Sequence, residues 1–303
     1  MLNNSYFEVQ KNGVSPFQNM ICYLGGSTFQ TIGDNPLTAY RQFIQQYAKD
    51  KNGNYVSSSV ATKEAQNIFI QSPISASMSG LSTRLVGVLL KRVPKFGFLL
   101  GYTTLTGNAG EPGYGAATAA SVLSAPFINP VRMIEKQQRA HFRKTGSAKL
   151  VRDILTESSA QNYKPLFRGT IPLIGHSMIS ALLGLVGQPQ LQKKIQTYVG
   201  NNSKIGESGA NLIASSAVTP FYVILTNPLS RLEVIMQTSA IKEKRISTFQ
   251  ACKEIGQDMT KNGMKGIFRG QGVGMVKGIV SLTLFHEGRL FLTRHFKEYN
   301  ESS

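Results

Sequence analysis

The sequence predicts an all-α membrane protein with six long helices in three repeats, and three observations support that fold class. The dipeptide Asn-Pro recurs at Pro36, Pro130 and Pro228, which are 94 and 98 residues apart in a chain of 303. Long Gly- and Ala-rich stretches carry few charges, as in helices that pack closely in lipid. Polar, basic connections separate these stretches. A threefold internal repeat favours one body built from three similar units.

The first repeat, 14–110, is expected to hold two long helices joined by a polar connection. The first helix, over 14–46, bends near Pro36, because proline lacks a backbone donor and clashes with the preceding turn. The connection contains a short amphipathic helix over 58–70, and the second long helix runs over 81–105.

Each later repeat follows the same order of long helix, polar connection and long helix. In the second repeat, 111–206, the expected spans are 114–141, 149–158 and 171–199. In the third repeat, 207–299, they are 208–239, 247–260 and 272–297.

Hydropathy and charge bear on where such a protein works. The mean hydropathy is −0.11 and every 18-residue stretch contains polar residues, which is typical of a soluble protein. Helices that line an aqueous cavity nevertheless carry polar residues on their inner faces. The net charge of +17 indicates an anionic partner, which could be nucleic acid, anionic lipid or an anionic solute. If the helices cross a membrane, the basic connections within the repeats lie on its positive side.

The sequence offers no arrangement of residues typical of catalysis or metal binding. Cys22 and Cys252 have neither disulfide nor metal spacing, and the four histidines are spread over the chain. No nucleophile has a base placed beside it in the pattern. We expect no metal, no cofactor and no enzymatic activity.

Polar side chains stand two and five positions after each repeated proline. Residues three apart share a helix face; the pairs are Thr38 with Arg41, Arg132 with Glu135, and Ser230 with Glu233. Any single Asn-Pro is explained more simply as the N-cap and first residue of a helix. The recurrence favours three proline-kinked helices around an axis, with six polar side chains converging.

These residues resemble the mitochondrial carrier family, whose three repeats carry Pro-x-[Asp/Glu]-x-x-[Lys/Arg] on odd helices and an aromatic-Arg-Gly signature before even helices. The signature is present as Phe167-Arg168-Gly169 and Phe268-Arg269-Gly270, while Thr83-Arg84-Leu85 is a weak counterpart in the first repeat. The resemblance covers roughly 15–297. It implies six transmembrane helices about a pseudo-threefold axis, with short amphipathic helices on the matrix side.

The resemblance also implies a matrix-side gate of ion pairs between neighbouring repeats. When the family's pairing is applied to this chain, Arg132 pairs with Glu233. The arginine stands at the family's acidic position and the glutamate at its basic position, so the ion pair is reversed. The other two pairs each join a neutral side chain to a charged one, namely Thr38 with Glu135 and Ser230 with Arg41. Each would be a hydrogen bond of about 1.5–3 kcal/mol if well formed. We therefore predict a gate with one ion pair.

The family's bracing glutamine position and its second gate are only partly recognisable in this chain. The bracing position holds Gln45 and Gln237, with Arg139 in the middle repeat. On the cytoplasmic side, the nearest approach to the family's second gate motif is the stretch 285–289, Phe-His-Glu-Gly-Arg.

By the same resemblance, the substrate binds about eight residues after the signature arginine. Those positions hold His176 with Ser177, Lys277, and either Lys91 or Arg92. Taken alone, His176 would be an interior histidine and Lys277 a solvated lysine. Cations around an aqueous cavity suit a multiply charged anion.

The expected substrate is a nucleotide such as ATP or ADP. The stretch 268–278 is similar to the sixth-helix entry of ADP/ATP carriers, whereas their run of three Arg and three Met is missing from 232–237. The resemblance implies alternating access in the mitochondrial inner membrane by a monomer that contacts lipid, cardiolipin by family likeness, and no nucleic acid.

Several alternatives stay open. The solute could be phosphate, a carboxylate or a coenzyme. The protein could instead be a basic helical protein that binds nucleic acid or a membrane surface. The eroded motifs also allow a carrier-like protein made by one organism and used in the mitochondria of its host.

Overall fold

The computed structural model describes residues 16–49, 54–106, 114–199, 206–239 and 246–302, and within these ranges the predicted all-α fold is confirmed. The uninterrupted long helices are α2 (Pro16–Gln46), α5 (Leu81–Thr106), α6 (Tyr114–Thr145), α10 (Glu207–Thr238) and α13 (Gln271–Ser302). Another long element is divided into α8 (Thr170–Ser180), the π-helical segment η2 (Ala181–Gly187) and α9 (Gln188–Val199). The bounds lie within a few residues of those expected, whereas the π-helical segment was not predicted.

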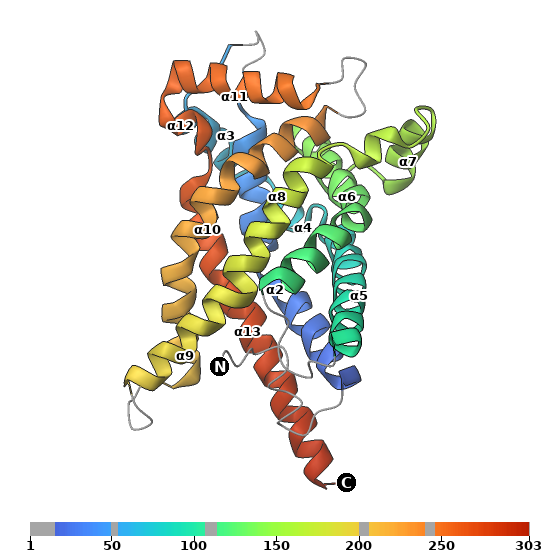
Figure 1. Ribbon diagram of the computed structural model, residues 1–303. Coiled ribbons are helices and arrows are strands. Elements are labelled where there is room, and N and C mark those ends of the chain that lie inside the picture. The colour runs from blue at the N-terminus through green and yellow to red at the C-terminus, as the bar shows by residue number, and fades with distance from the viewer. Residues whose placement is uncertain (1–15, 50–53, 107–113, 200–205, 240–245, 303) are drawn as a thin grey trace.

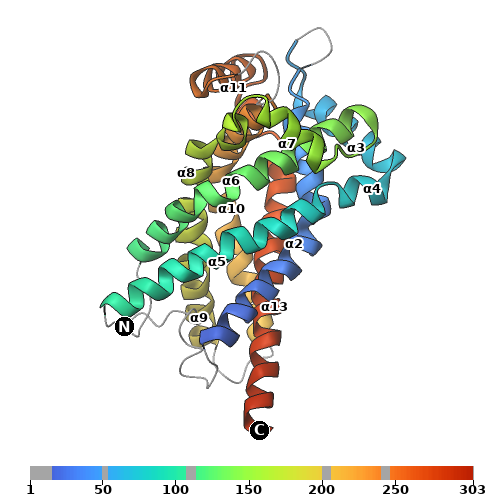
Figure 2. The same ribbon diagram turned by 90° about the vertical axis from the view of Figure 1, so that its right-hand side faces the viewer.

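The shorter helices gather at one end of the long ones, at the top of Figures 1 and 2. They are α3 (Ser58–Gln71), α4 (Pro73–Met78), α7 (Val151–Ser159), η1 (Lys164–Phe167), α11 (Thr248–Asn262) and α12 (Met264–Ile267). Ser247 begins α11 with a capping box, in which its hydroxyl accepts from the Gln250 amide and the Gln250 side chain accepts in return. The expected boundaries at 14, 110 and 111 lie outside the described residues.

The three repeated prolines lie inside helices. Pro36 is within α2, Pro130 within α6 and Pro228 within α10. The simpler explanation, in which each Asn-Pro starts a helix, is therefore wrong. Each helix continues for about two turns or more beyond its proline, which is long enough to carry residues two, five and nine positions later onto one side.

Helices α2 and α13 lie side by side, which brings the first and last repeats into contact (Figures 1 and 2). Glycines allow the close approach. A Cβ on Gly26 would lie 2.6 Å from the Phe285 carbonyl oxygen, and one on Gly288 would lie 3.2 Å from the Gly26 Cα. Small residues at such crossings let helix backbones touch.

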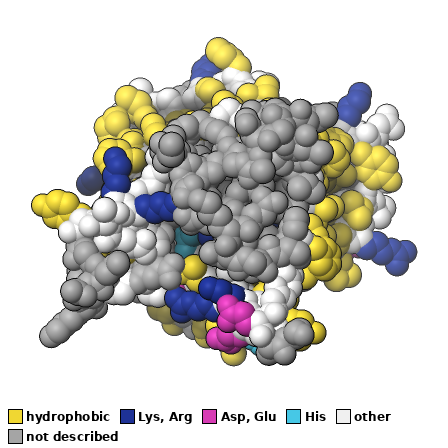
Figure 3. Space-filling view, turned by 60° about the horizontal axis from the view of Figure 1, so that its bottom comes forward, with side chains coloured by type: hydrophobic (Ala, Val, Ile, Leu, Met, Phe, Trp, Pro, Cys, Tyr) yellow, Lys and Arg dark blue, Asp and Glu magenta, His cyan; other side chains and the backbone are white. Residues whose placement is uncertain are grey.

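The described bundle buries many polar side chains and exposes many large apolar ones on its outside. More of the described buried side chains are polar or charged than apolar, while Phe29, Phe127 and Phe221 are each half exposed or more. Figure 3 shows hydrophobic side chains along the flanks of the face opposite the short helices. Two stretches, Lys164–Leu183 and Ser208–Thr238, are long and apolar enough to span a membrane by length and composition.

Candidate functional site: a charged cavity between the long helices

A central cavity of about 230 Å³ is lined by residues from α2, α5, α6, α8, α10 and α13. Three carboxylates line it, Asp34, Glu135 and Glu233. The basic side chains on its wall are more numerous, namely Arg41, Arg84, Lys91, Arg92, Arg132, Lys136 and Lys277. Seven cations against three carboxylates leave four positive charges in excess, so the cavity favours an anion.

The expected contact between Arg132 and Glu233 is present. The Arg132 Nη1 atom lies 3.2 Å from Glu233 Oε2 and links α6 to α10. Glu233 also pairs with Lys136, whose Nζ lies 2.7 Å from Oε1. Sequence reasoning missed Lys136, although it follows Arg132 by four residues and so shares its helix face.

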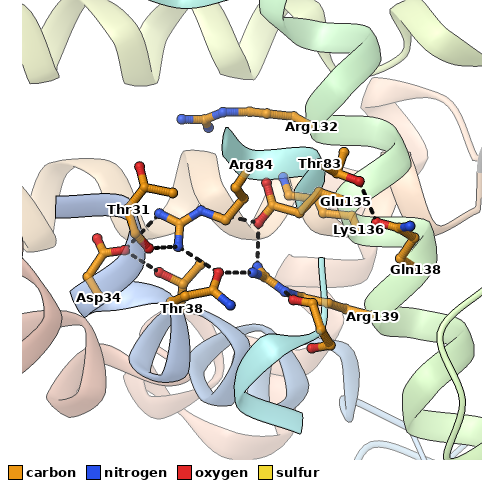
Figure 4. Close-up of polar contacts among 12 residues, drawn as sticks. Thr31, Asp34, Thr38, Thr83, Arg84, Arg132, Glu135, Lys136, Gln138 and Arg139 are labelled. Atoms are coloured by element: carbon orange, nitrogen blue, oxygen red, sulfur yellow. Dashed lines mark hydrogen bonds and ion pairs between the residues drawn. The ribbon is translucent and has the colours of Figure 1, made fainter. Parts of the chain in front are cut away.

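The other acid of the repeated motif has different partners from those expected. Glu135 pairs with Arg139 of its own helix and lies 3.8 Å from Arg84 Nε. The Thr38 hydroxyl contacts Asp34 Oδ1 at 3.5 Å (Figure 4). The predicted hydrogen bond between Thr38 and Glu135 is therefore wrong, because arginines lie closer to this carboxylate and bind it more strongly than a neutral hydroxyl.

Arg41 is also bound differently. Its Nη2 donates to Asn227 Oδ1 at 2.5 Å, and no bond to Ser230 forms within the described residues. Gly274 makes room for the guanidinium, since a Cβ there would lie 3.2 Å from Arg41 Nε. In the described part of the chain, no carboxylate lies within 4 Å of Arg41. The Ser230 side chain lines the cavity wall instead.

These contacts overturn the prediction of a single ion pair. Around the cavity, carboxylates pair with Arg84, Arg132, Lys136, Arg139 and Lys277. The acidic and basic positions of the motif cannot reveal this, because Arg84, Lys136 and Asp34 all stand outside it.

The three bracing positions and the three Asn-Pro asparagines form a ring around the bundle. Gln45 donates to Asn227 at 3.3 Å, and Gln237 donates to Asn129 at 2.8 Å. Arg139 completes the ring by donating to Asn35 at 2.8 Å. Each repeat is thereby tied to its neighbour by one side-chain bond of the same kind.

The same asparagines hold the segments that lead into the even-numbered long helices. Asn129 Nδ2 donates to the Leu166 and Arg168 carbonyls at 3.0 and 3.1 Å, and Asn227 Nδ2 donates to Ile267 at 3.2 Å. In the first repeat, Asn35 Nδ2 donates to the Ser77 carbonyl at 2.5 Å.

Glycines with left-handed backbone end these three segments. Gly80, Gly169 and Gly270 have φ of +70°, +80° and +69°, a region that glycine enters without strain. The first-repeat counterpart of the signature is therefore Met78-Ser79-Gly80, and the assignment to Thr83-Arg84-Leu85 is wrong. In this register Gly87 corresponds to His176 and Lys277.

The signature side chains make protein contacts. Arg269 is fully buried and binds both oxygens of Asp258, at 2.7 and 2.8 Å. Arg168 donates to the Ile246 carbonyl at 3.2 Å. Arg269 is therefore not exposed at the surface, whereas Phe167 is 53% exposed and Phe268 is half-buried.

All five predicted binding residues lie on the cavity wall, which includes Lys91 and Arg92 together. His176 is buried and contacts the Tyr222 hydroxyl at 3.4 Å, a partner that sequence reasoning missed. Ser177 is buried one residue further along α8. The guanidinium of Arg92 lies over the rings of Tyr23 and Phe285, 5.2 and 4.9 Å from their centres.

Among the described residues, the stretch 285–289 makes aromatic contacts and hydrogen bonds to neutral side chains at the far end of the cavity. Glu287 accepts hydrogen bonds from Ser208 at 2.8 Å and Asn211 at 2.9 Å. Phe285 packs edge-to-face against Tyr23 with ring centres 5.1 Å apart. Aromatic packing of α13 on α2, and hydrogen bonds from α10 to the Glu287 carboxylate of α13, thus join these helices here.

Comparison with known proteins gives one partial similarity. No family model matches the sequence. The chain is 25% identical over 164 residues to nicotinamide adenine dinucleotide transporter 1, chloroplastic, of Arabidopsis thaliana. The match covers 51% of this chain and 50% of the relative, so the chain spans about half the length of the curated relative it matches. The chain is thus distantly similar to a transporter of a nucleotide cofactor.

Proposed function

We propose that the protein is a carrier of the mitochondrial type, whose six long helical elements span a membrane and move an anionic nucleotide through the central cavity. One observation carries the proposal: a cavity with four excess positive charges lies inside a bundle that exposes many large apolar side chains on its outside. Polar groups facing inward and apolar groups facing outward suit a protein with lipid outside and water at its centre.

A nucleotide is the preferred substrate for two reasons. Phosphate groups match the arginine forks and lysines of the wall, and the distant relative is named as a nicotinamide adenine dinucleotide transporter. We propose ATP or ADP first, with a dinucleotide such as NAD as the second candidate. No conversion of the substrate is proposed.

Transport would proceed by alternating access. The pairs of Glu233 with Arg132 and Lys136 hold α6 to α10 near the short-helix end of the cavity. An anion that binds these cations weakens their hold on Glu233, and its binding energy offsets the cost of separating the helices.

The proposed setting is the mitochondrial inner membrane, with the protein acting as a monomer. Anionic lipid is the proposed second partner. The exposed Phe167 and the left-handed Gly169 mark one place where a lipid could contact the end of α8.

The test is uptake of radiolabelled ATP, ADP, NAD, phosphate and malate, each measured separately, into liposomes that hold the purified protein and are loaded with nucleotide, phosphate, malate or buffer. Uptake that requires internal nucleotide supports nucleotide exchange. Uptake of NAD alone moves the substrate to dinucleotides. If phosphate or malate is taken up and no nucleotide is, the substrate proposal is wrong and smaller anions replace it.

A further inference from the structure

We infer that Asp34 is an internal counter-ion of the anion site: it pairs with Arg84 and Lys277, and it limits how much negative charge the carrier accepts. This inference rests on the proposed function, since it concerns the same cavity. Asp34 lies on α2, two residues before Pro36, and only 1% of its side chain is exposed.

The contacts of Asp34 join three helices across the cavity. Its Oδ1 lies 2.8 Å from Arg84 Nη2 on α5. Its Oδ2 accepts from the Ser281 hydroxyl on α13 at 2.9 Å and lies 3.7 Å from Lys277 Nζ. All of these side chains line the cavity, so the carboxylate sits where a bound anion would meet the same donors.

Position in the repeat sets Asp34 apart. The residues two before the other repeated prolines are Ile128 and Thr226, both uncharged. Thr226 uses its hydroxyl locally, donating to the Tyr222 carbonyl at 2.7 Å. Only the first repeat therefore has a carboxylate at this position of the cavity wall. Asp34 takes no part in the ring of hydrogen bonds to the Asn-Pro asparagines, so that ring does not require it.

The two cations are held unequally. Besides Asp34, Arg84 has the acceptor Asn35 Oδ1 at 2.9 Å and the Glu135 carboxylate at 3.8 Å. Lys277 has one carboxylate within 4 Å among the described residues, at the longer distance of 3.7 Å. An entering phosphate group would thus recruit Lys277 more readily than Arg84. Once it does, Asp34 remains beside the ligand and repels it in proportion to the ligand's charge.

The consequence is a selectivity for modest negative charge. Asp34, Lys277 and Arg84 together carry one positive charge, and without the carboxylate they would carry two. Asp34→Asn keeps the side-chain size and removes the repulsion. We expect it to favour anions of high charge over those of low charge.

The experiment measures binding of orthophosphate, pyrophosphate and tripolyphosphate to the purified full-length protein in detergent at neutral pH. We expect Asp34→Asn to raise the affinity ratio of tripolyphosphate to orthophosphate by about tenfold or more, since Coulomb repulsion grows with ligand charge. Asp34→Glu keeps the charge and should leave the ratio unchanged. Asp153→Asn, an exposed substitution on α7 with the same change in charge, serves as the control.

A second pair of variants covers the case in which Asp34→Asn does not fold. Lys277→Gln should lower the ratio, and adding Asp34→Asn to it should bring the ratio back toward wild type. The inference is overturned if Asp34→Asn changes all affinities by one factor, if the double variant shows no recovery, or if wild type binds none of the three phosphates.

Phosphate binding separates this inference from the proposed function. A shifted ratio in a protein that takes up no nucleotide would support Asp34 as counter-ion and refute nucleotide transport. Nucleotide uptake together with an affinity ratio that Asp34→Asn leaves unchanged would support nucleotide transport and refute the role of Asp34 as counter-ion.

Discussion

Glu233 shows how a reversed charge pattern can still join two repeats. The carboxylate is buried and lies between Arg132 and Lys136, so one acid on α10 forms ion pairs with two cations on α6. Coulomb attraction does not depend on which helix carries which sign. The sequence motif therefore identified the contact, while the second cation came from a neighbouring turn of the same helix.

A charge exchange tests the role of this contact in transport. Arg132→Glu places a second carboxylate beside Glu233, and we expect uptake to fall about tenfold or more, because an unpaired buried charge costs about 3–5 kcal/mol. Combining it with Glu233→Arg should restore uptake only in part, since Lys136 would then face a new arginine. Adding Lys136→Gln should restore more.

The control for that series is Arg152→Glu, an exposed reversal on α7 outside the cavity. Uptake by the double and triple variants no greater than by Arg132→Glu alone would contradict the paired role.

At the scale of elements, two helix contacts decide how the bundle closes. Glycines bring the backbones of α2 and α13 together, which joins the first repeat to the last. At the short-helix end, Asp258 of α11 joins α10 to the segment before α13, because it pairs with both Arg231 and Arg269.

The close crossing of α2 and α13 should not tolerate an added methyl group. Gly26→Ala places a Cβ 2.6 Å from the Phe285 carbonyl oxygen, a backbone atom that moves only if the helices separate. We expect a loss of about 1–3 kcal/mol, typical of overpacking. Thermal unfolding in detergent measures it.

Gly97→Ala on α5 is the matched control, since its Cβ would meet nothing within 4 Å. Equal melting temperatures for the two variants would show that the crossing is looser than described.

The buried Asp258 should make stability depend on pH. Burial by itself raises the pKa of Asp258, but hydrogen bonds from Arg269 and Asn262 outweigh it, so the pKa lies below its usual value. A carboxylate of lowered pKa stabilises the fold above its unfolded pKa of about 3.9. That contribution is lost as the pH falls through the folded pKa.

We therefore expect Asp258→Asn to destabilise the protein by about 3–5 kcal/mol near neutral pH, because two buried arginines lose their carboxylate. The difference from wild type should shrink as the pH falls below about 4. Unfolding measured across this pH range, with Asp153→Asn as the exposed control, checks the prediction. If the difference in stability between Asp258→Asn and wild type did not change with pH, the charge of Asp258 would not be the source of its contribution.

At the scale of the whole molecule, the described chain has a charged cavity at its centre. Apolar side chains lie along its flanks (Figure 3), and short helices cover one end (Figure 1). The described parts of the basic connections within the repeats, which include α3, α7 and α11, lie at that end (Figure 1). If the long elements span a membrane, all the short helices lie on its positive side.

The cysteines test this topology. Cys252 is exposed on α11 and Cys22 is buried in α2. In sealed membrane vesicles that contain the protein, an impermeant maleimide should label Cys252 when the short-helix end faces outward and leave it unlabelled when that end faces inward. Cys22 should react only after denaturation.

Cys252→Ser is the control for assigning the label.

The same membranes, washed with alkaline carbonate, should retain the protein. Release into the wash would favour a peripheral basic protein over a six-span carrier.

The sequence by itself determined the helices and their order. Periodic apolar stretches, turn residues and the spacing of three prolines act locally, so α2, α3, α5, α10 and α11 fell within a few residues of their predicted bounds. The contact of Arg132 with Glu233 and the wall positions of His176 and Lys277 were expected from the resemblance to the mitochondrial carrier family.

Only the tertiary structure decided the remaining partners. Asp34, Arg84, Lys136 and Tyr222 stand outside every motif, and their contacts depend on how helices distant in sequence cross. The first-repeat signature was misplaced because its aromatic and arginine are absent, and the left-handed backbone of Gly80 identified it. Helix formation depends on neighbours along the chain, whereas the charge pairing of a cavity depends on neighbours in space.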